Sequence, residues 1–279
     1  MKTNNFAFQG VNGAYSEQAG KNVFPDAKSI PCSTFEEMFA CVRNDKADIA
    51  LVPIENSQAG RVADTQRLIP DSDLNIIGEY FLEVRHNLLA LPGTKISEIK
   101  RIHSHEQGIA QCRNKIIKLN KQMVIAADTA GSAKKISELK NKEDAAIASS
   151  LAAEIYNLEV IESDFQDAEH NVTRFLIMSK DNSDIEPSES NIITTLVFVV
   201  RSIPASLYKC LGGFASNGVN ITKLESYIHP QGFDVAQFYI DFEGHPENNS
   251  VKLALEEMKF FCKEIKVLGV YKKSNFRKK

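Results

Sequence analysis

The sequence lacks three features that would assign a chain at once to a broad class: a strong excess of one charge, a long apolar run and an apolar segment within its first residues. It has 33 lysines and arginines against 36 aspartates and glutamates, for a formal net charge of −3, so there is no electrostatic case for nucleic acid. No window approaches the roughly 18 apolar residues of a membrane-spanning helix, and the N-terminal residues contain no apolar h-region. We therefore expect a cytoplasmic protein, with neither nucleic acid nor a membrane as partner.

Patterns that bind metals are also sparse. The cysteines are odd in number, widely spaced and without a C-x-x-C pair, which indicates reduced thiols in the core rather than a disulfide or zinc framework. His103 and His105 lie two residues apart, but no carboxylate or cysteine stands at ligand spacing. We therefore expect no metal and no cofactor, and we interpret His105 as a polar wall residue of a site or as a helix N-terminal cap. The cysteines are Cys32, Cys41, Cys112, Cys210 and Cys262.

The chain is long enough for one large domain or two ordinary ones. Residues 181–191 are acidic and rich in serine, with one proline, as in a linker. This segment predicts a boundary between a domain at 1–180 and a second at 192–271. Residues 272–279 form a basic tail, which we expect to be a solvated terminus.

In the first domain, short apolar strands alternate with amphipathic helices. Ser16 is interpreted as a helix N-cap, and Ser33 with Glu36 as a capping box. The alternation predicts an α/β fold with parallel sheets. The expected strands are residues 6–8, 49–54, 101–104, 123–127 and 145–148, and the expected helices follow at about 107–119, from Thr129 and from Ser149 or Ser150.

Polar clusters follow each of these strands. Open α/β sheets bind ligands beyond the carboxyl ends of their strands, and helix N-termini there favour anions. Five loops are therefore predicted to converge on one anion-binding cleft; the alternative is that each serine or threonine only caps its own helix. The loops are residues 10–16, 55–57, 104–107, 128–132 and 149–150.

A polar trio interrupts the apolar strand at residues 171–178. Asn171, Thr173 and Arg174 supply an amide, a hydroxyl and a guanidinium, and arginine can bind a carboxylate through two parallel hydrogen bonds. The run 52–57 has the same form, an apolar strand that ends in three polar groups. The two runs favour a small-molecule enzyme over a structural protein.

The second domain has a different pattern. Its order is strand, helix, strand, strand, helix, strand in about 80 residues, which is typical of a ferredoxin-like βαββαβ unit. Gly212-Gly213 within the first helix indicates close approach by a ligand or partner, or tight packing. The expected strands are residues 192–200, 221–229, 233–242 and 265–271, the expected helices 204–217 and 247–262, and the expected turn 230–232.

Five short motifs stand in a characteristic order along the chain: Gly10-x-x-Gly13-Ala14-Tyr15-Ser16, Val52-Pro53-Ile54-Glu55-Asn56-Ser57-x-x-Gly60, His103-Ser104-His105-x-Gln107, Asp128-Thr129-Ala130 and Asn171-x-Thr173-Arg174-Phe175. Through these motifs the chain resembles the prephenate dehydratase family over nearly its whole length. The resemblance implies a catalytic domain with the two-lobed fold of periplasmic binding proteins, its site in the cleft between the lobes, followed by an ACT regulatory domain. No helical chorismate mutase module is expected before the first strand.

The resemblance implies conversion of prephenate to phenylpyruvate, with Thr173 as a catalytic residue. We read its hydroxyl as a hydrogen-bond donor to the departing oxygen. Glu55 is a candidate proton source if burial raises its pKa, although it could equally cap the next helix. Arg174 is the candidate for gripping a carboxylate. The other expected substrate-binding residues are Ser16, Asn56, Ser57, His105, Gln107, Thr129, Ser149, Asn171 and Phe175.

Regulation by phenylalanine is a further expectation from the resemblance. Residues 205–207 stand at the positions of the family's Gly-Ala-Leu stretch but depart from it. The Glu225-Ser226 pair matches the first half of its Glu-Ser-Arg-Pro stretch, whereas Tyr227-Ile228 replaces Arg-Pro. The expected effector-site residues are Ala205, Ser206, Leu207, Glu225 and Ser226. Because ACT domains usually pair, we expect a homodimer or homotetramer. Two alternatives stay open: arogenate as the substrate, and a non-catalytic amino-acid sensor.

Overall fold

The computed structural model describes residues 3–229 and 232–278, and their contacts divide the chain into two units. The first unit comprises residues up to 66 and residues 80–175; the second comprises residues 67–79 and 176–279. Strands β5 (Asn75–Glu83) and β11 (Val172–Ser179) contribute residues to both units. The domain limits predicted at 181–191 stay a prediction.

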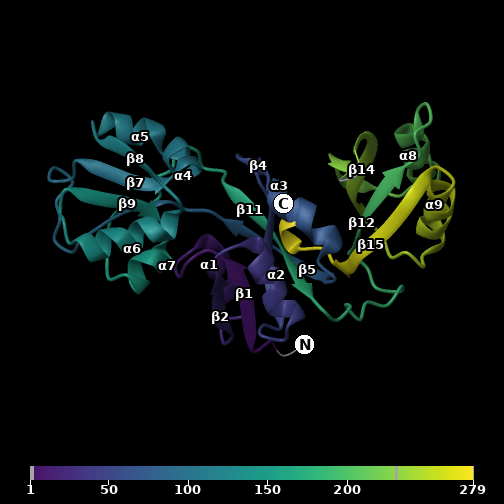
Figure 1. The fold of residues 1–279 in the computed structure, drawn as a ribbon, viewed down its shortest axis with the longest axis horizontal. Helices are drawn as coiled ribbons and strands as arrows, with labels where there is room; N and C mark the ends of the chain where they lie inside the picture. Colours follow the sequence, from purple (N-terminus) through teal and green to yellow (C-terminus); the bar gives the residue numbers. More distant parts are fainter. Residues whose placement is uncertain (1–2, 230–231, 279) are drawn as a thin grey trace. The chain divides into compact units, whose positions relative to one another are not determined.

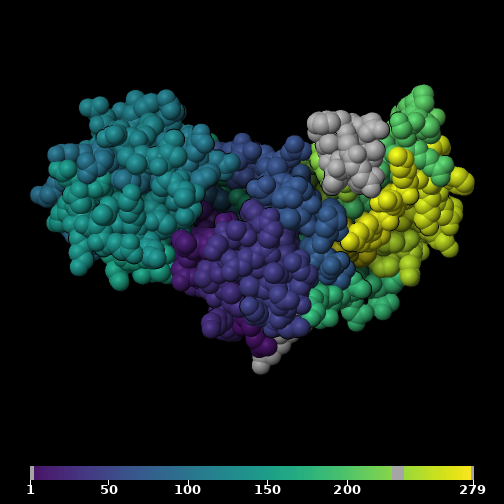
Figure 2. All heavy atoms as spheres, viewed as in Figure 1, coloured from purple at the N-terminus to yellow at the C-terminus, as the bar shows by residue number. Residues whose placement is uncertain are grey.

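The first lobe of the first unit is built on a parallel sheet with β1 at its centre. Strand β1 pairs with β2 on one side and β3 on the other. Phe6, Ala7 and Phe8 are fully buried because α1 and α2 contact this sheet, and Figure 2 shows these N-terminal elements, in purple, as one closely packed body of side chains. The elements are β1 (Asn5–Gln9), α1 (Tyr15–Val23), β2 (Lys28–Cys32), α2 (Phe35–Arg43), β3 (Ile49–Asn56), β4 (Gly60–Arg61) and α3 (Ala63–Leu68).

Both helix caps predicted for this lobe were wrong by one or two residues. Helix α1 begins at Tyr15 with Ala14 as its N-cap, so Ser16 lies inside the first turn. Helix α2 is capped by Thr34, whose hydroxyl accepts a hydrogen bond from the Glu37 amide at 3.1 Å. The Glu37 carboxylate accepts in return from the amide of Ser33, at 2.7 Å. The reciprocal logic of a capping box is present, shifted one residue along the chain.

The second lobe has a mixed five-stranded sheet with helices on both faces (Figure 1). Residues of α4 and α5 pack with Ile102 and Ile147 on one face, and residues of α6 and α7 pack with Ala146 and Ala148 on the other, as the two-residue period of a strand requires. The elements are β6 (Asn87–Ala90), β7 (Arg101–His105), α4 (Glu106–Gln111), α5 (Arg113–Lys118), β8 (Gln122–Ala126), α6 (Thr129–Leu139), β9 (Asp144–Ala148), α7 (Ser150–Ile155) and β10 (Glu159–Glu162).

Two features of this lobe differ from the sequence prediction. Strands β6 and β10 pair antiparallel, whereas β7, β8 and β9 are parallel as expected. The helix expected over residues 107–119 is two short helices that meet at Cys112. All five cysteines are free and buried, in agreement with the prediction of reduced core thiols.

Asp144 anchors the edge of β9 through a buried polar cluster. Its carboxylate accepts two bonds from Arg101, at 2.6 and 2.9 Å, one from His103 Nε2 at 2.9 Å and one from Asn141 at 2.7 Å. The Arg101 guanidinium, opposed by burial and aided by His103, lowers the pKa of Asp144 to about 2. His103 therefore has a structural role, as a hydrogen-bond partner of the Asp144 carboxylate.

This cluster predicts acid-sensitive stability. Because the folded pKa of Asp144 lies below the ordinary value of 3.8, its contribution of about 2.5 kcal/mol is complete above pH ~4 and is lost as the pH falls toward ~2. Urea unfolding of Asp144→Asn should show a lower stability at neutral pH and a shallower decline between these limits. Glu143→Gln, at a neighbouring half-buried carboxylate paired with Lys100, is the matched control and should stay within about 1 kcal/mol. Equal acid profiles for the two variants would contradict the assignment.

The second unit contains the predicted βαββαβ order. Its sheet runs β13-β14-β12-β15 with antiparallel neighbours, and β15 continues to β5 through the parallel pair Gly269 and Ile76. The elements are η1 (Ile69–Asp71), β12 (Ile192–Val200), α8 (Ser206–Ser216), β13 (Ile221–His229), β14 (Gly232–Glu243), α9 (Asn249–Lys259), β15 (Cys262–Lys272) and η2 (Asn275–Lys278). The turn predicted at 230–232 falls largely outside the described residues.

Helices α8 and α9 cover one face of this sheet, where Phe198, Ile240 and Phe242 form the core (Figure 1). The helix expected from Pro204 begins two residues later, after Ala205 in a left-handed conformation. A Cβ on Gly213 would lie 2.9 Å from the Ala254 carbonyl oxygen of α9, whereas one on Gly212 would contact nothing within 4 Å. Tight packing therefore explains Gly213 but not Gly212.

The basic tail is bound within this unit, so the expectation of a solvated terminus was wrong. Arg277 donates to both carboxylate oxygens of Glu79, at 2.7 and 2.9 Å, and lies 3.4 Å from Asp241. Both carboxylates are buried, and a buried carboxylate requires such a partner. No helix within residues 3–229 and 232–278 combines the length and apolarity needed to cross a bilayer.

Candidate active site

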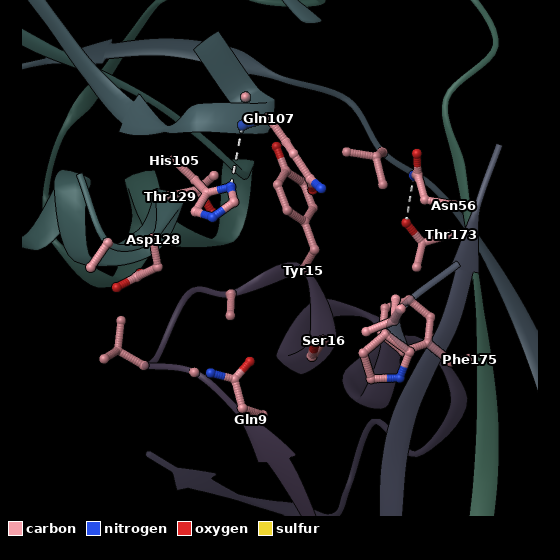
Figure 3. A pocket seen from close by; sticks show the side chains of 18 of the residues that line it. Gln9, Tyr15, Ser16, Asn56, His105, Gln107, Asp128, Thr129, Thr173 and Phe175 are labelled. Atoms are coloured by element: carbon pink, nitrogen blue, oxygen red, sulfur yellow. Dashed lines mark hydrogen bonds between the residues drawn. The ribbon is translucent and has the colours of Figure 1, made fainter. Parts of the chain in front are cut away.

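A cavity of about 710 Å³ opens in the first unit, where both lobes supply its walls (Figure 3). This volume is in the range of small-molecule sites. The loop after β1, the end of β3 and strand β11 form one side, and the helix starts after β7 and β8 form the other. The polar residues in its wall are Gln9, Tyr15, Ser16, Ser33, Asn56, His86, His105, Gln107, Gln111, Asp128, Thr129 and Thr173.

Most of the residues expected to bind substrate lie in this wall, and the rest lie behind it. Those in the wall are Ser16, Asn56, His105, Gln107, Thr129, Thr173 and Phe175. Those outside it are Glu55, Ser57, Ser149, Asn171 and Arg174. Four of the five predicted loops therefore contribute to one cavity, and their roles toward substrate stay predictions.

The fifth loop has a structural role. Ser149 caps α7 by accepting from the Ala152 amide at 3.0 Å, and it donates to the Gly13 carbonyl at 2.6 Å. It therefore joins α7 to the loop that carries Tyr15. Ser57 acts similarly, because its hydroxyl accepts from the Val172 amide at 3.0 Å and holds the end of β3 against β11.

Strand β11 presents alternate residues to the cavity. Thr173 and Phe175 line it, and Arg174 between them points away, since neighbouring side chains of a strand face opposite sides. Arg174 is buried, and its guanidinium lies 3.1 Å from the Glu55 carboxylate. A carboxylate bonded to a guanidinium is held as an acceptor. Arg174 and Glu55 are thus placed as an ion pair behind the wall rather than as groups that reach into the cavity.

Asn56 fixes the polarity of the hydrogen bonds at Thr173. Its side-chain oxygen accepts from the backbone amides of Gln58 and Ala59, at 3.0 and 2.8 Å. Because backbone amides can only donate, the Nδ2 group of Asn56 must face the other way. It donates to Asn171 Oδ1 at 2.8 Å and to Thr173 Oγ1 at 2.9 Å; the second bond is drawn in Figure 3.

The same polarity continues to Gln111 and His86, which were not predicted from the sequence, and to Tyr15, which was predicted only as part of the loop at 10–16. Asn171 Nδ2 donates to Gln111 Oε1 at 2.9 Å, and His86 Nε2 lies 2.7 Å from the same oxygen. His86 Nε2 therefore carries a proton. Its other nitrogen, Nδ1, lies 2.7 Å from the hydroxyl of Tyr15. Burial raises the pKa of Tyr15 well above its ordinary value and lowers that of His86, where the bond to Gln111 opposes the effect.

These hydrogen bonds determine where the Thr173 hydroxyl can donate. Since its oxygen already accepts a hydrogen bond from Asn56, the hydroxyl hydrogen is available to a ligand in the cavity. This bond also increases the donor strength of the hydroxyl, as polarised chains of hydrogen bonds do. The arrangement makes Thr173 a directed hydrogen-bond donor.

The charged groups of the wall are few. Among the lining residues that the structure describes there is no lysine or arginine, and Asp128 is the only carboxylate. Asp128 caps α6 by accepting from the Gly131 amide at 2.5 Å. The described wall also contains two histidines, His86 and His105, and the N-termini of α1 and α6, whose dipoles favour an anion.

The residues expected to bind an effector lie in the second unit. Ala205 is the N-cap of α8, Ser206 begins the helix, and Leu207 packs against its core. Glu225 lies on β13, with the ammonium group of Lys223 at 3.4 Å from its carboxylate, and Ser226 follows on the same strand. Their part in binding stays a prediction.

Comparisons with known proteins agree with this geometry. The profile of the prephenate dehydratase family matches residues 6–183. A bifunctional N-acyl-homoserine lactone acylase/prephenate dehydratase of Komagataeibacter europaeus is 44% identical over 273 residues, covering 98% of this chain and 97% of the relative. Arogenate dehydratase 2 of Petunia hybrida is 38% identical and covers 95% of this chain and 71% of its own.

A solved structure shares the fold over both units. Prephenate dehydratase of Arthrobacter aurescens in complex with L-Phe superposes with a TM-score of 0.87 at 33% identity, over 96% of this chain and 90% of that chain. This confirms the predicted fold class, an α/β protein with a two-lobed catalytic part followed by a βαββαβ unit. The chain therefore belongs to the prephenate dehydratase family and is an enzyme of the carbon–oxygen lyase class.

Proposed function

We propose that the protein converts prephenate to phenylpyruvate, as a step in the biosynthesis of phenylalanine. The ring carboxylate leaves as CO2, and the electron pair of the broken C–C bond enters the ring as it becomes aromatic. The 4-hydroxyl leaves with the electrons of its C–O bond and takes up one proton to become water. The enzyme must therefore hold a dianion and assist the departing oxygen, while no carbon-bound proton needs to be removed.

The proposal rests on one observation, the orientation of the Thr173 hydroxyl toward the cavity. The hydroxyl faces a cavity of suitable size, and its oxygen is occupied by Asn56, so that its hydrogen is directed at the ligand. A donor fixed in advance toward a developing negative charge stabilises the transition state more than the ground state. The ion pair of Arg174 with Glu55 lies directly behind and holds the ends of β3 and β11 together.

Turnover of prephenate tests the proposal directly. Purified protein should release phenylpyruvate, measured by its ultraviolet absorbance in alkali. N-acyl-homoserine lactone hydrolysis, which is named for the Komagataeibacter relative, is measured on the same preparation. Prephenate binding without turnover would favour the sensor alternative, and the absence of both would overturn the proposal.

Arogenate is the second candidate substrate, and Asp128 favours it. Arogenate carries an ammonium group where prephenate has a keto group, and Asp128 places a carboxylate in the cavity wall. The Petunia relative is named an arogenate dehydratase. The ratio of kcat/KM for the two substrates decides the preference, and Asp128→Asn should shift this ratio toward prephenate if the carboxylate pairs with the ammonium group.

We infer that the second unit is an ACT domain that binds phenylalanine. Support comes from its βαββαβ order and from the L-Phe complex of the Arthrobacter protein. Calorimetry should detect phenylalanine binding and inhibition of turnover. Glu225→Gln should weaken binding, since the carboxylate lies near the effector motif and is the natural partner for the ligand's ammonium group. The absence of heat at millimolar phenylalanine would remove this inference.

We also propose that the protein is a cytoplasmic homodimer or homotetramer. Large apolar side chains are exposed on the second unit; Tyr208 is 79% exposed and Phe260 72%. Exposed apolar groups of this size are typical of association surfaces. Sedimentation velocity should give a species of at least twice the mass of one chain.

A further inference from the structure

His86 has a hydrogen-bond partner ready for each of two protonation states. Its Nε2 proton is directed to Gln111 Oε1 in both, because the amide polarity set by Asn56 leaves that oxygen as an acceptor. Its Nδ1 lies 2.7 Å from the Tyr15 hydroxyl. That hydroxyl lies in turn 3.0 Å from the carbonyl oxygen of Arg85. The single phenolic proton can therefore go to either acceptor.

In the neutral state, Tyr15 donates to the bare Nδ1 of His86. In the cationic state, Nδ1 carries a proton and donates to the Tyr15 oxygen, and the phenolic proton turns to the carbonyl of Arg85. The ring nitrogens of His86 and the Tyr15 hydroxyl keep a hydrogen-bond partner in both states. His86 can therefore gain a proton with no rearrangement other than rotation of the Tyr15 hydroxyl. Burial lowers the pKa of His86, which makes the neutral state the resting one near neutral pH.

His105, the other histidine of the cavity wall, has different hydrogen bonds. Its Nδ1 accepts a hydrogen bond from the backbone amide of Gln107 at 3.3 Å, as the N-cap of α4 (Figure 3). Protonation at that nitrogen would place two donors against each other and break the cap. Nδ1 of His105 is therefore occupied as an acceptor, whereas Nδ1 of His86 faces a hydroxyl that can serve as donor or acceptor.

We propose that His86 takes up a proton when the dianionic substrate binds, and so provides the compensating positive charge in a cavity whose described wall has no lysine or arginine. The inference rests on the proposed function, which supplies the dianion. His86 then acts by binding and positioning, with Tyr15 as the group that accommodates the extra proton. A dianion close to the ring raises its proton affinity by direct attraction.

We assign the proton uptake to His86 after considering the titratable and charged groups on the surrounding elements. From α1 comes Tyr15, and from the α4–α5 junction comes Cys112, whose pKa burial raises to about 12. On its own segment Arg85 is exposed and bonded to Asp164 and Glu83. Other charged groups near these elements include Glu17 of α1, which accepts from the Gly13 amide, and Lys115 of α5, which donates to Glu162. Asp167 accepts from the amides of Asn114 and Lys115, and the cavity wall adds Asp128 and His105.

Proton uptake on binding is the direct test. Prephenate is titrated calorimetrically into the Thr173→Val protein, which binds but turns over slowly, at about pH 7.5 in buffers of different ionisation enthalpy. The buffer dependence gives the number of protons taken up, which should approach about one per prephenate. In Thr173→Val/His86→Gln the uptake should be lost, because glutamine keeps a donor for Gln111 and cannot titrate.

His105→Asn is the matched control, since asparagine can still cap α4. Its uptake should equal that of the parent, and a loss confined to this variant would overturn the proposal in favour of His105. Tyr15→Phe should reduce uptake, because the charged ring then lacks its acceptor at Nδ1. Binding of prephenate with no buffer dependence in the parent would overturn the proposal while leaving the proposed function intact.

A second measurement is the pH dependence of turnover by the native protein. It does not require the Thr173→Val variant and can be made even if that variant does not fold. In the native protein, kcat/KM should fall as the pH rises above the pKa of free His86, approaching tenfold per pH unit. His86→Gln should raise KM more than it lowers kcat and should flatten this limb. An unchanged limb in that variant would contradict the proposal; the absence of turnover in the native protein would instead refute the proposed function.

Discussion

We expect Thr173→Val to lower kcat on prephenate by about 10²- to 10⁴-fold while the protein stays folded. Valine keeps the shape of the side chain and its preference for a strand. It removes the hydroxyl that Asn56 orients toward the ligand. The departing oxygen then loses its fixed donor, and water in the cavity replaces it only poorly, because water is not held in place. Steady-state kinetics with circular dichroism as the check on folding measures the effect.

Thr173→Ser is the matched control, because it restores the donor without the methyl group. It should recover most of kcat, and KM should change little in either variant, since the bond to the oxygen strengthens only as the C–O bond breaks. Valine and serine variants of equal activity would remove Thr173 from the chemistry. An increase in KM with unchanged kcat would reassign it to substrate binding.

The strand-end loops could be predicted from the sequence because their signal is local. A buried strand followed by polar residues marks the edge of an α/β sheet where ligands bind, and Asn56, Gln107 and Thr129 all lie in the cavity wall. The opposite directions of Thr173 and Arg174 were also within reach of the sequence. The two-residue period of a strand places neighbours on opposite faces, so Thr173 and Arg174 are not expected to line the same wall.

The chain of hydrogen bonds from Asn56 to Tyr15 could not be predicted in this way. Gln111 and His86 are 25 residues apart, and Asn171 joins Gln111 across 60 residues. No spacing rule links them, and His86 follows β5, which the alternating pattern did not reveal. The partners of Arg277 were hidden for the same reason, since Glu79 is 198 residues away. Buried polar groups must find partners, but the sequence does not say which.

Asn56→Asp is expected to reduce kcat as severely as Thr173→Val, with little change in shape. The introduced carboxylate still accepts from the amides of Gln58 and Ala59, so the loop after β3 keeps its turn. Its second oxygen, however, replaces the amide that donates to Thr173 and Asn171. The Thr173 hydroxyl then donates to this oxygen instead of the substrate. KM should also rise, because a second carboxylate repels the dianion.

The change in hydrogen-bond direction should extend from residue 56 through Asn171 and Gln111 to His86. Asn171 must turn its amide toward the new carboxylate, which places its oxygen against Gln111 Oε1, and Gln111 must turn in response. His86 Nε2 then faces a donor and loses its proton to Nδ1, so that the ring changes tautomer. Nitrogen-15 NMR of the histidine ring reads this directly: Nε2 carries the proton in the native protein, and Nδ1 should carry it in the variant.

Asn171→Asp distinguishes the effect of hydrogen-bond direction at Thr173 from the effect of an added negative charge. It adds the same negative charge one residue further along the chain of hydrogen bonds, and its carboxylate still accepts from Asn56 Nδ2, so the donor to Thr173 is kept. Only the bonds from Gln111 to His86 should reverse. The loss of kcat should therefore be clearly smaller than for Asn56→Asp, although both variants switch the His86 tautomer. Equal losses would show that the added charge, and not the direction of the Thr173 proton, controls the rate.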